Sequence, residues 1–208
     1  MRTRELILSA AAVIALCAPS ASAQQSGTSS TTATTDKSAS IAQRKDNQQD
    51  RIAQGVDSGR LTAGETKRIE TGEAGLDKEE HTMRSEDDGH LTAADRAKLD
   101  RQQNHLSNRI YEDKHNARTA HYGNNEVGQR RENQQDRIAQ GIQSGQLKPG
   151  ETAHLERQQQ SINREDAAMR KANGGTLTGA DKQALNQRQN NASKNIYDKK
   201  HNGRRTRP

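Results

Sequence analysis

The sequence predicts an all-α protein made of two tandem three-helix repeats, built of helix-loop-helix hairpins, that follow a signal peptide and a disordered tether. The first observation behind this prediction is a repeat: residues 44–116 recur without a gap as residues 130–202, with 34 of 73 positions identical. The second is that large apolar residues recur every seven positions, as in Ile69, Leu76 and Met83. The third is composition, because alternating β-branched runs are missing while Gln, Glu, Arg, Lys and Ala dominate.

An export signal is predicted at residues 1–23. Two arginines precede the apolar run LILSAAAVIALCAP, and the small residues ASA stand directly before Gln24. This order of basic, apolar and small residues is typical of a cleaved bacterial signal peptide, so we expect cutting before Gln24. No later segment is apolar enough to predict a membrane span, and we expect a periplasmic or secreted protein.

A lipoprotein anchored through Cys17 is the alternative to the cleaved signal. The residue before a lipidated cysteine is normally small, and Leu16 is not, so the sequence favours cleavage. Cys17 is the single cysteine of the chain. After cleavage the protein would therefore form no disulfide and offer no thiolate for catalysis or metal binding.

Three segments are expected to lack regular structure. Residues 24–43 are rich in Ser and Thr and nearly free of large apolar side chains, which is typical of a disordered linker. Residues 117–129 are expected to link the two copies of the repeat, and residues 203–208, GRRTRP, to form a frayed basic tail.

The repeats themselves (44–116 and 130–202) are each predicted to hold three helices, the last two forming an antiparallel hairpin. The expected ranges are about 44–57, 63–86 and 92–115 in the first copy, and 130–143, 149–172 and 178–201 in the second. Hydrophobic residues make up only 28 % of the chain and aromatic residues 1 %. One copy alone would have a thin core, so we expect stabilisation from the other copy, from self-association or from a ligand.

A shorter motif, G-x-L-[T/K]-x-x-[E/D], begins at Gly59, Gly89, Gly145 and Gly175. The simplest interpretation is helix capping: the glycine makes a turn, the threonine hydroxyl accepts from a free backbone N–H, and the acid three residues later reaches back. The predicted capping pairs are Thr62 with Glu65, Thr92 with Asp95, and Thr178 with Asp181. In the third unit Lys148 replaces the threonine, but the following proline suits a first helical turn.

The same spacing resembles the second half of an EF-hand calcium loop, in which a glycine makes the turn and an acid six residues later binds the ion. The unit at Gly89 is the best match, and the resemblance implies that Glu86, Asp88 and Asp95 would be the metal ligands and calcium the ion. The first position of that loop is Arg84, however, and the other three units lack most of the oxygen ligands. The resemblance therefore supports a helix-loop-helix shape better than calcium binding, and capping and a partial cation site both remain open.

The second shared motif is IYEDKHN at residues 110–116, which returns as IYDKKHN at residues 196–202. Lysine and histidine in a last turn, followed by asparagine, are typical of a helix C-terminus, where cations meet the negative end of the dipole and asparagine tolerates a left-handed conformation. The longest identical run, NQQDRIAQG, is expected to lie on the first helix of each copy with Ile52 and Ile138 inward. Sequence reasoning gives no physical account of its polar residues.

Several classes of function are disfavoured. No glycine-flanked nucleophile, HExxH helix or phosphate-binding loop is present, so we expect no enzymatic activity and no cofactor. The formal charge is +6, but basic and acidic residues are interspersed and aromatic stacking platforms are missing. Nucleic acid is therefore not an expected partner.

Taken together, the GxLTxxE and IYxxKHN motifs and the tandem repeat behind an export signal resemble a family of secreted bacterial proteins of uncharacterised activity. The resemblance covers about residues 44–202 and implies no ligand or functional residue. A fainter likeness, to periplasmic stress chaperones with an LTxxQ motif, rests on setting and composition. The leading hypothesis is a non-enzymatic envelope protein that binds a protein partner or client; a divalent-cation-binding protein and a hydrophilin-like protectant are the alternatives.

Overall fold

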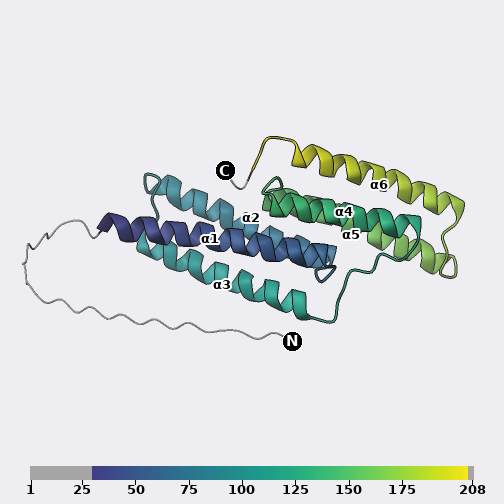
Figure 1. The fold of residues 1–208 in the computed structure, drawn as a ribbon, viewed down its shortest axis with the longest axis horizontal. Helices are drawn as coiled ribbons and strands as arrows, with labels where there is room; N and C mark the ends of the chain where they lie inside the picture. Colours follow the sequence, from purple (N-terminus) through teal and green to yellow (C-terminus); the bar gives the residue numbers. More distant parts are fainter. Residues whose placement is uncertain (1–29, 206–208) are drawn as a thin grey trace, which may run out of the picture.

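The computed structural model describes residues 30–205, and every regular element in that range is a helix (Figure 1). The predicted all-α class is confirmed. The helices are α1 (Ser30–Asp57), α2 (Ala63–Glu86), α3 (Ala93–His115), α4 (Glu126–Gln143), α5 (Pro149–Ala172) and α6 (Gly179–Lys200). The predicted signal peptide, the first residues of the predicted tether and the last three residues of the basic tail lie outside the described residues.

The helix starts expected at 44 and 130 are wrong, because α1 begins at Ser30 and α4 at Glu126. Residues 30–43, which composition alone predicted to be a disordered linker, are helical here. Ile41 and its counterpart Val127 explain part of the difference, since each is buried in the core. The backbone carbonyl of Ile41 also accepts from the Gln103 side chain, and that of Val127 from Gln189. In the sequence, one apolar residue at the end of a polar stretch is too weak a signal to predict either boundary.

The predicted helix caps are confirmed. Thr62, Thr92 and Thr178 each accept from the backbone N–H of the acid three residues on, and each acid accepts in return from the backbone N–H of its threonine. In α5 only the return bond forms: the backbone N–H of Lys148 donates to Glu151 at 3.2 Å, and Pro149 starts the helix. Capping therefore fixes where α2, α3, α5 and α6 begin.

The helices pack in two groups that overlap at the middle of an elongated molecule (Figure 1). On one side α3 packs against α1 and α2; on the other α6 packs against α4 and α5. The groups meet where α2 lies against α5 and α1 against α4. This junction is nearly two-fold symmetric, because Gly64 of α2 faces Gln160 of α5 while their counterparts Gly150 and Ala74 face each other in exchanged roles.

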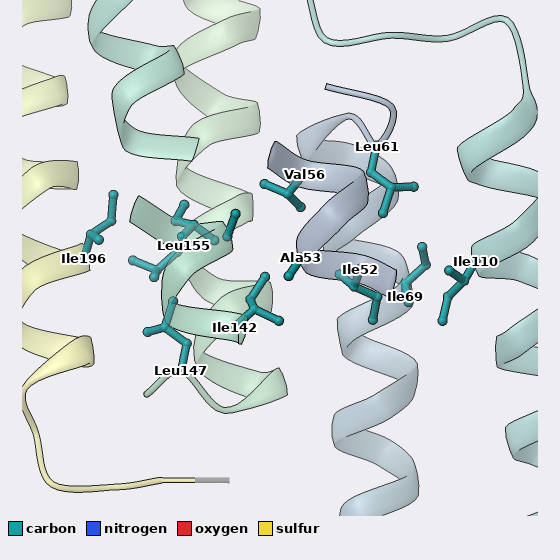
Figure 2. Close-up of a cluster of buried hydrophobic side chains, with 12 residues drawn as sticks. Ile52, Ala53, Val56, Leu61, Ile69, Ile110, Ile142, Leu147, Leu155 and Ile196 are labelled. Atoms are coloured by element: carbon teal, nitrogen blue, oxygen red, sulfur yellow. The ribbon is translucent and has the colours of Figure 1, made fainter. Parts of the chain in front are cut away.

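The central hydrophobic core lies at this junction and takes the same positions from both copies (Figure 2). Its twelve residues are six pairs separated by 86 positions: Ile52 and Ile138, Ala53 and Ala139, Val56 and Ile142, Leu61 and Leu147, Ile69 and Leu155, Ile110 and Ile196. Two smaller clusters lie farther out, one around Leu99 and one around Leu185. Each group of helices thus contributes half of a shared core. Burial against the other group compensates for the small number of apolar residues in either copy.

Candidate functional site

The NQQDRIAQG run has two adjacent glutamines that are buried and hydrogen-bonded in each copy, whereas Asn47 and Gln54 of the same run are exposed. Gln48 of α1 donates from Nε2 to the backbone oxygen of Gln103 at 2.8 Å, and its counterpart Gln134 does the same to Gln189 at 2.7 Å. These glutamines are 3 % and 2 % exposed, so substituting them would leave helix carbonyls and amides without partners in the core. The structure therefore gives the reason, invisible in the sequence, why these polar residues recur.

The arginine of the run ties α1 to α3 in the first copy and α4 to α6 in the second. Arg51 donates to the hydroxyl and the backbone oxygen of Ser107, and Arg137 donates to the backbone oxygen of Ser193. The backbone oxygen of Arg51 in turn accepts from Lys114 at 3.1 Å, as that of Arg137 does from Lys200. The lysines of the IYxxKHN motif thus bond α3 to α1 and α6 to α4.

Buried carboxyl groups line the facing sides of α2 and α5. Glu70, Glu73 and Glu156 are each at most 1 % exposed. Gln49 donates to Glu70 at 3.3 Å, and Gln135 donates to Glu156 at 3.1 Å. One neutral donor for each of these two buried carboxyls satisfies part of its hydrogen-bonding capacity without neutralising a charge.

The pKa values of these groups are raised. Burial raises the pKa of Glu156 to about 8, against the lowering effect of the bond from Gln135. Burial, reinforced by Asp77 and opposed by Lys45, raises the pKa of Glu73 to about 7. Burial, and after it repulsion from Glu73, raises the pKa of Glu70 well above its ordinary value. Glu70 and Glu156 are fully enclosed, so neither carboxyl is accessible to a substrate.

Glu73 differs because it lines a cleft. The first-copy cleft, about 220 Å³, lies beside the start of α5; Lys45, Asp46, Gln49, Glu73, Asp77, Lys148, Pro149 and Arg205 line it. The second-copy cleft, about 130 Å³, lies at the equivalent place beside the start of α2; Thr62, Ala63, Thr119, Ala120, His121, Tyr122, Gln135, Gln159 and Asn163 line it. The repeat thus creates two related clefts with different linings.

The two tyrosines of the IYxxKHN motifs are exposed. Tyr111 is 60 % and Tyr197 57 % exposed, and they are the large hydrophobic side chains on the surface of the described residues. Each ring stacks on the histidine four residues later, with centroids 4.2 Å apart for His115 and 4.1 Å for His201. The motif therefore presents one aromatic ring pair from each copy to solvent.

The asparagine that ends the motif does not take the left-handed conformation that we expected. Asn116 is extended, with φ −76° and ψ 171°, and no positive φ occurs at Asn202. Both asparagines act through their side chains instead: Asn116 donates to Glu65 at 2.8 Å, and Asn202 donates to Glu151 at 2.6 Å. This bond joins the end of one helix to the capping acid of another. The two residues are 51 positions apart, so the motif alone does not predict their contact.

Of the predicted metal ligands, Glu86 is the last residue of α2, Asp88 lies in the loop between α2 and α3, and Asp95 lies in the first turn of α3; their oxygens face competing donors or solvent. Asp95 accepts from the hydroxyl and backbone N–H of Thr92, while Glu86 and Asp88 are exposed. Arg84 donates to the backbone oxygen of Gly89 at 3.2 Å, so a cation of the protein already contacts the loop. Within the part of the chain that the structure describes, no group of three or more Asp, Glu, His or Cys side chains is arranged to hold a metal ion.

Comparison with known proteins gave no match to a family model, to a curated protein or to a solved structure. Among residues 30–205, no helix has the length and apolar character needed to cross a membrane.

Proposed function

We propose that this chain is a non-enzymatic protein of the bacterial envelope, periplasmic or secreted after cleavage before Gln24, and that it binds a protein partner or client. In this proposal residues 44–116 and 130–202 are two copies of a three-helix repeat. Duplication gives the protein two equivalent binding surfaces, one on each flank of the shared core. The resemblance to secreted tandem-repeat proteins and to periplasmic stress chaperones supports the same setting.

The observation that carries the proposal is the pair of exposed Tyr–His stacks. Most identical residues of the two copies have a packing or hydrogen-bonding role, as the glutamines of the NQQD run do. Tyr111 and Tyr197 have no comparable burial, yet both are present and both stack on a histidine. Tyrosine is enriched at protein interfaces because it offers a large apolar area with few rotatable bonds and a hydroxyl that can bond.

The tyrosines also lie on rigid supports. Ile110 and Ile196, the residues directly before them, are fully buried at opposite sides of the central core (Figure 2). A partner that contacts a Tyr–His stack therefore meets a surface whose backbone is already fixed, which lowers the entropy cost of binding. Two such surfaces on one chain would raise the avidity for a multivalent or aggregating client.

The test compares the exported chain with the double variant Tyr111→Ser, Tyr197→Ser. Both side chains are exposed, so the thermal melt should change little, while recovery of cross-linked envelope proteins and suppression of the aggregation of a heated test client should be lost. The matched control is Ala97→Ser, Gln183→Ser, which changes equivalent exposed positions at the other end of α3 and α6. Equal recovery and equal suppression by all three proteins would reject the proposal.

A cation-binding role and a protectant role receive less support. Calcium would have to displace Arg84 from the Gly89 oxygen and Thr92 from Asp95. A hydrophilin-like protectant needs little fixed structure, whereas the two copies here share a core of interdigitated side chains.

A further inference from the structure

The first-copy cleft contains buried hydrogen-bond acceptors that lack donors. Glu73 is 1 % and Gln49 7 % exposed, and both side chains line the cleft. Among the described residues, no donor reaches the Oε1 atom of either side chain. A buried polar atom without a partner costs free energy, and two of them in one cleft indicate a ligand that carries N–H or O–H donors.

The cleft carries acids and cations at different depths. Glu73 is buried, whereas Lys148 and Arg205, which also line the cleft, are exposed to solvent. No ion pair between described residues joins Glu73 to either of these cations. The cleft therefore has an acidic floor and a basic mouth.

The other charged residues of the lining already have partners. The Lys45 ammonium lies 2.5 Å from Asp77 and 3.1 Å from Glu80, so these two acids neutralise it. Asp46 is half-buried and is also engaged in an interaction. Glu73 at the floor and the two cations at the mouth are therefore the charges that a ligand would meet.

The second-copy cleft lacks both kinds of charge. The residues at the positions of Glu73, Lys148 and Arg205 are all neutral there: Gln159, Thr62 and Thr119. That cleft is also smaller, about 130 Å³ against 220 Å³. The floor acid and the mouth cations thus occur together in one copy and are replaced together in the other, as expected if one ligand contacts both.

Size and charge restrict the class of ligand. Pockets for drug-sized molecules have about 300–1,000 Å³, so the first-copy cleft suits a smaller molecule. A bare metal ion would leave the mouth cations without a partner, and the cleft has no metal-binding group of three acids or histidines among the described residues. An ammonium group has three donors for Glu73 and Gln49, and a carboxylate suits the cations at the mouth.

We propose that the first-copy cleft binds a small free amino acid as its zwitterion, with the ammonium group on Glu73 and Gln49 and the carboxylate at Lys148 and Arg205. Glu73 determines the specificity, because it is the anionic acceptor at the floor. The site is separate from the exposed tyrosines and does not depend on the proposed partner-binding function.

Isothermal titration calorimetry of residues 24–208 tests the site, with glycine, L-alanine and L-serine as the probes. At least one of them should bind with one-to-one stoichiometry. Glu73→Gln, which installs the residue of the equivalent position 159, should weaken that binding roughly tenfold or more, the effect of losing one charge-assisted hydrogen bond. Lys148→Thr, which installs the residue of position 62, should weaken it roughly two- to fivefold, because exposed ion pairs contribute less.

Two derivatives of the best-bound amino acid separate the two contacts. Its N-acetyl derivative lacks the ammonium group and should bind roughly tenfold or more weakly. Its methyl ester lacks the carboxylate and should bind roughly two- to fivefold more weakly, with no further loss in Lys148→Thr. Equal affinity for the amino acid and both derivatives would overturn the proposal.

Glu86→Gln, which removes an exposed carboxylate at the end of α2, is the matched control and should bind as the unsubstituted chain does. Circular dichroism should show the same helix content in every variant. Absence of binding by all three amino acids, or unchanged binding by Glu73→Gln, would overturn the proposal. Binding of magnesium but of no amino acid, lost in Glu73→Gln, would overturn it as well and assign the cleft to a divalent cation.

Discussion

The side-chain amide of Gln135 donates to the Glu156 carboxyl at 3.1 Å inside the junction, and 86 residues earlier Gln49 stands in the same relation to Glu70. All four side chains are buried. An acid in such a place is stable mainly in its protonated form, because burial penalises the charged form. The junction of this protein is therefore sensitive to pH.

We predict that the protein is most stable in mild acid. The folded-state pKa values of Glu73 and Glu156 are about 7 and about 8, above their ordinary value of 4.5. Between pH 4.5 and these raised values, the folded state therefore binds more protons than the unfolded state. The free energy of unfolding should fall as the pH rises from about 4.5 to 8, by up to about 1.4 kcal/mol per pH unit for each group.

Urea titrations at several pH values would measure this slope. Glu156→Gln should reduce it, because the amide does not titrate. Below pH 4.5 the trend reverses, since Glu65, Glu80 and other paired acids have lowered pKa values, and the stability that they contribute is lost as the pH falls through those values. A free energy of unfolding that rose between pH 5 and 8 would contradict the prediction.

Gln134→Met should destabilise the protein by about 1–3 kcal/mol. The change keeps the volume but leaves the Gln189 carbonyl and the Gln159 amide without their partner in the core. Gln129→Met makes the same change on the exposed face of α4 and should stay within about 0.5 kcal/mol of the unsubstituted protein. Denaturant midpoints compare the two, and equal effects would show that the buried amide contributes nothing.

Glycine has opposite roles at two helical positions. A Cβ atom at Gly141 would lie 2.6 Å from Cδ1 of Leu147, a fully buried residue of the central core, so Gly141→Ala should cost about 1–3 kcal/mol. A Cβ atom at Gly75 meets nothing within 4 Å, so Gly75→Ala should stabilise α2 by about 0.5–1 kcal/mol. The prediction fails if both variants shift the melting temperature in the same direction.

Truncation at the central core should affect both groups of helices. Leu155→Ala should cost about 2–5 kcal/mol and lower hydrogen-exchange protection in α1–α3 as well as α4–α6, because Leu155 packs in the core that both groups share. Leu185→Ala removes the same side-chain atoms from the outer cluster of α4–α6. Its loss of protection should be greatest in that group, and a purely local effect of Leu155→Ala would argue against a shared core.

Calcium should leave the thermal melt unchanged. Asp95 is engaged by Thr92, and Arg84 already donates to the loop carbonyl that a cation would need. The comparison is a circular-dichroism melt of residues 24–208 in EDTA and in excess calcium. If calcium raised the melting temperature and Asp88→Ala with Asp95→Ala removed the rise, the EF-hand interpretation would be restored.

Much of the fold is encoded in short-range patterns. The Thr-x-x-acid caps that start α2, α3 and α6 depend on residues three positions apart, and the inward positions of Ile69, Leu76 and Met83 depend on a seven-residue spacing. Such relations can be read along the chain because the helix itself brings these residues together. The all-α class and most helix boundaries follow from them.

The tertiary structure alone decided which polar residues are buried and where the clefts lie. Glu70 and Glu156 look like surface acids in the sequence, and they are enclosed only because α2 packs against α5. The cleft at Glu73 likewise needs side chains from α1, α2 and α5 and the start of the tail. The sequence does show that the two copies differ at these positions, because Glu73 and Asp77 of the first copy are acidic where Gln159 and Asn163 of the second are neutral. The meaning of this difference depends on contacts between residues far apart in the chain, which no periodicity encodes because the packing of whole helices creates them.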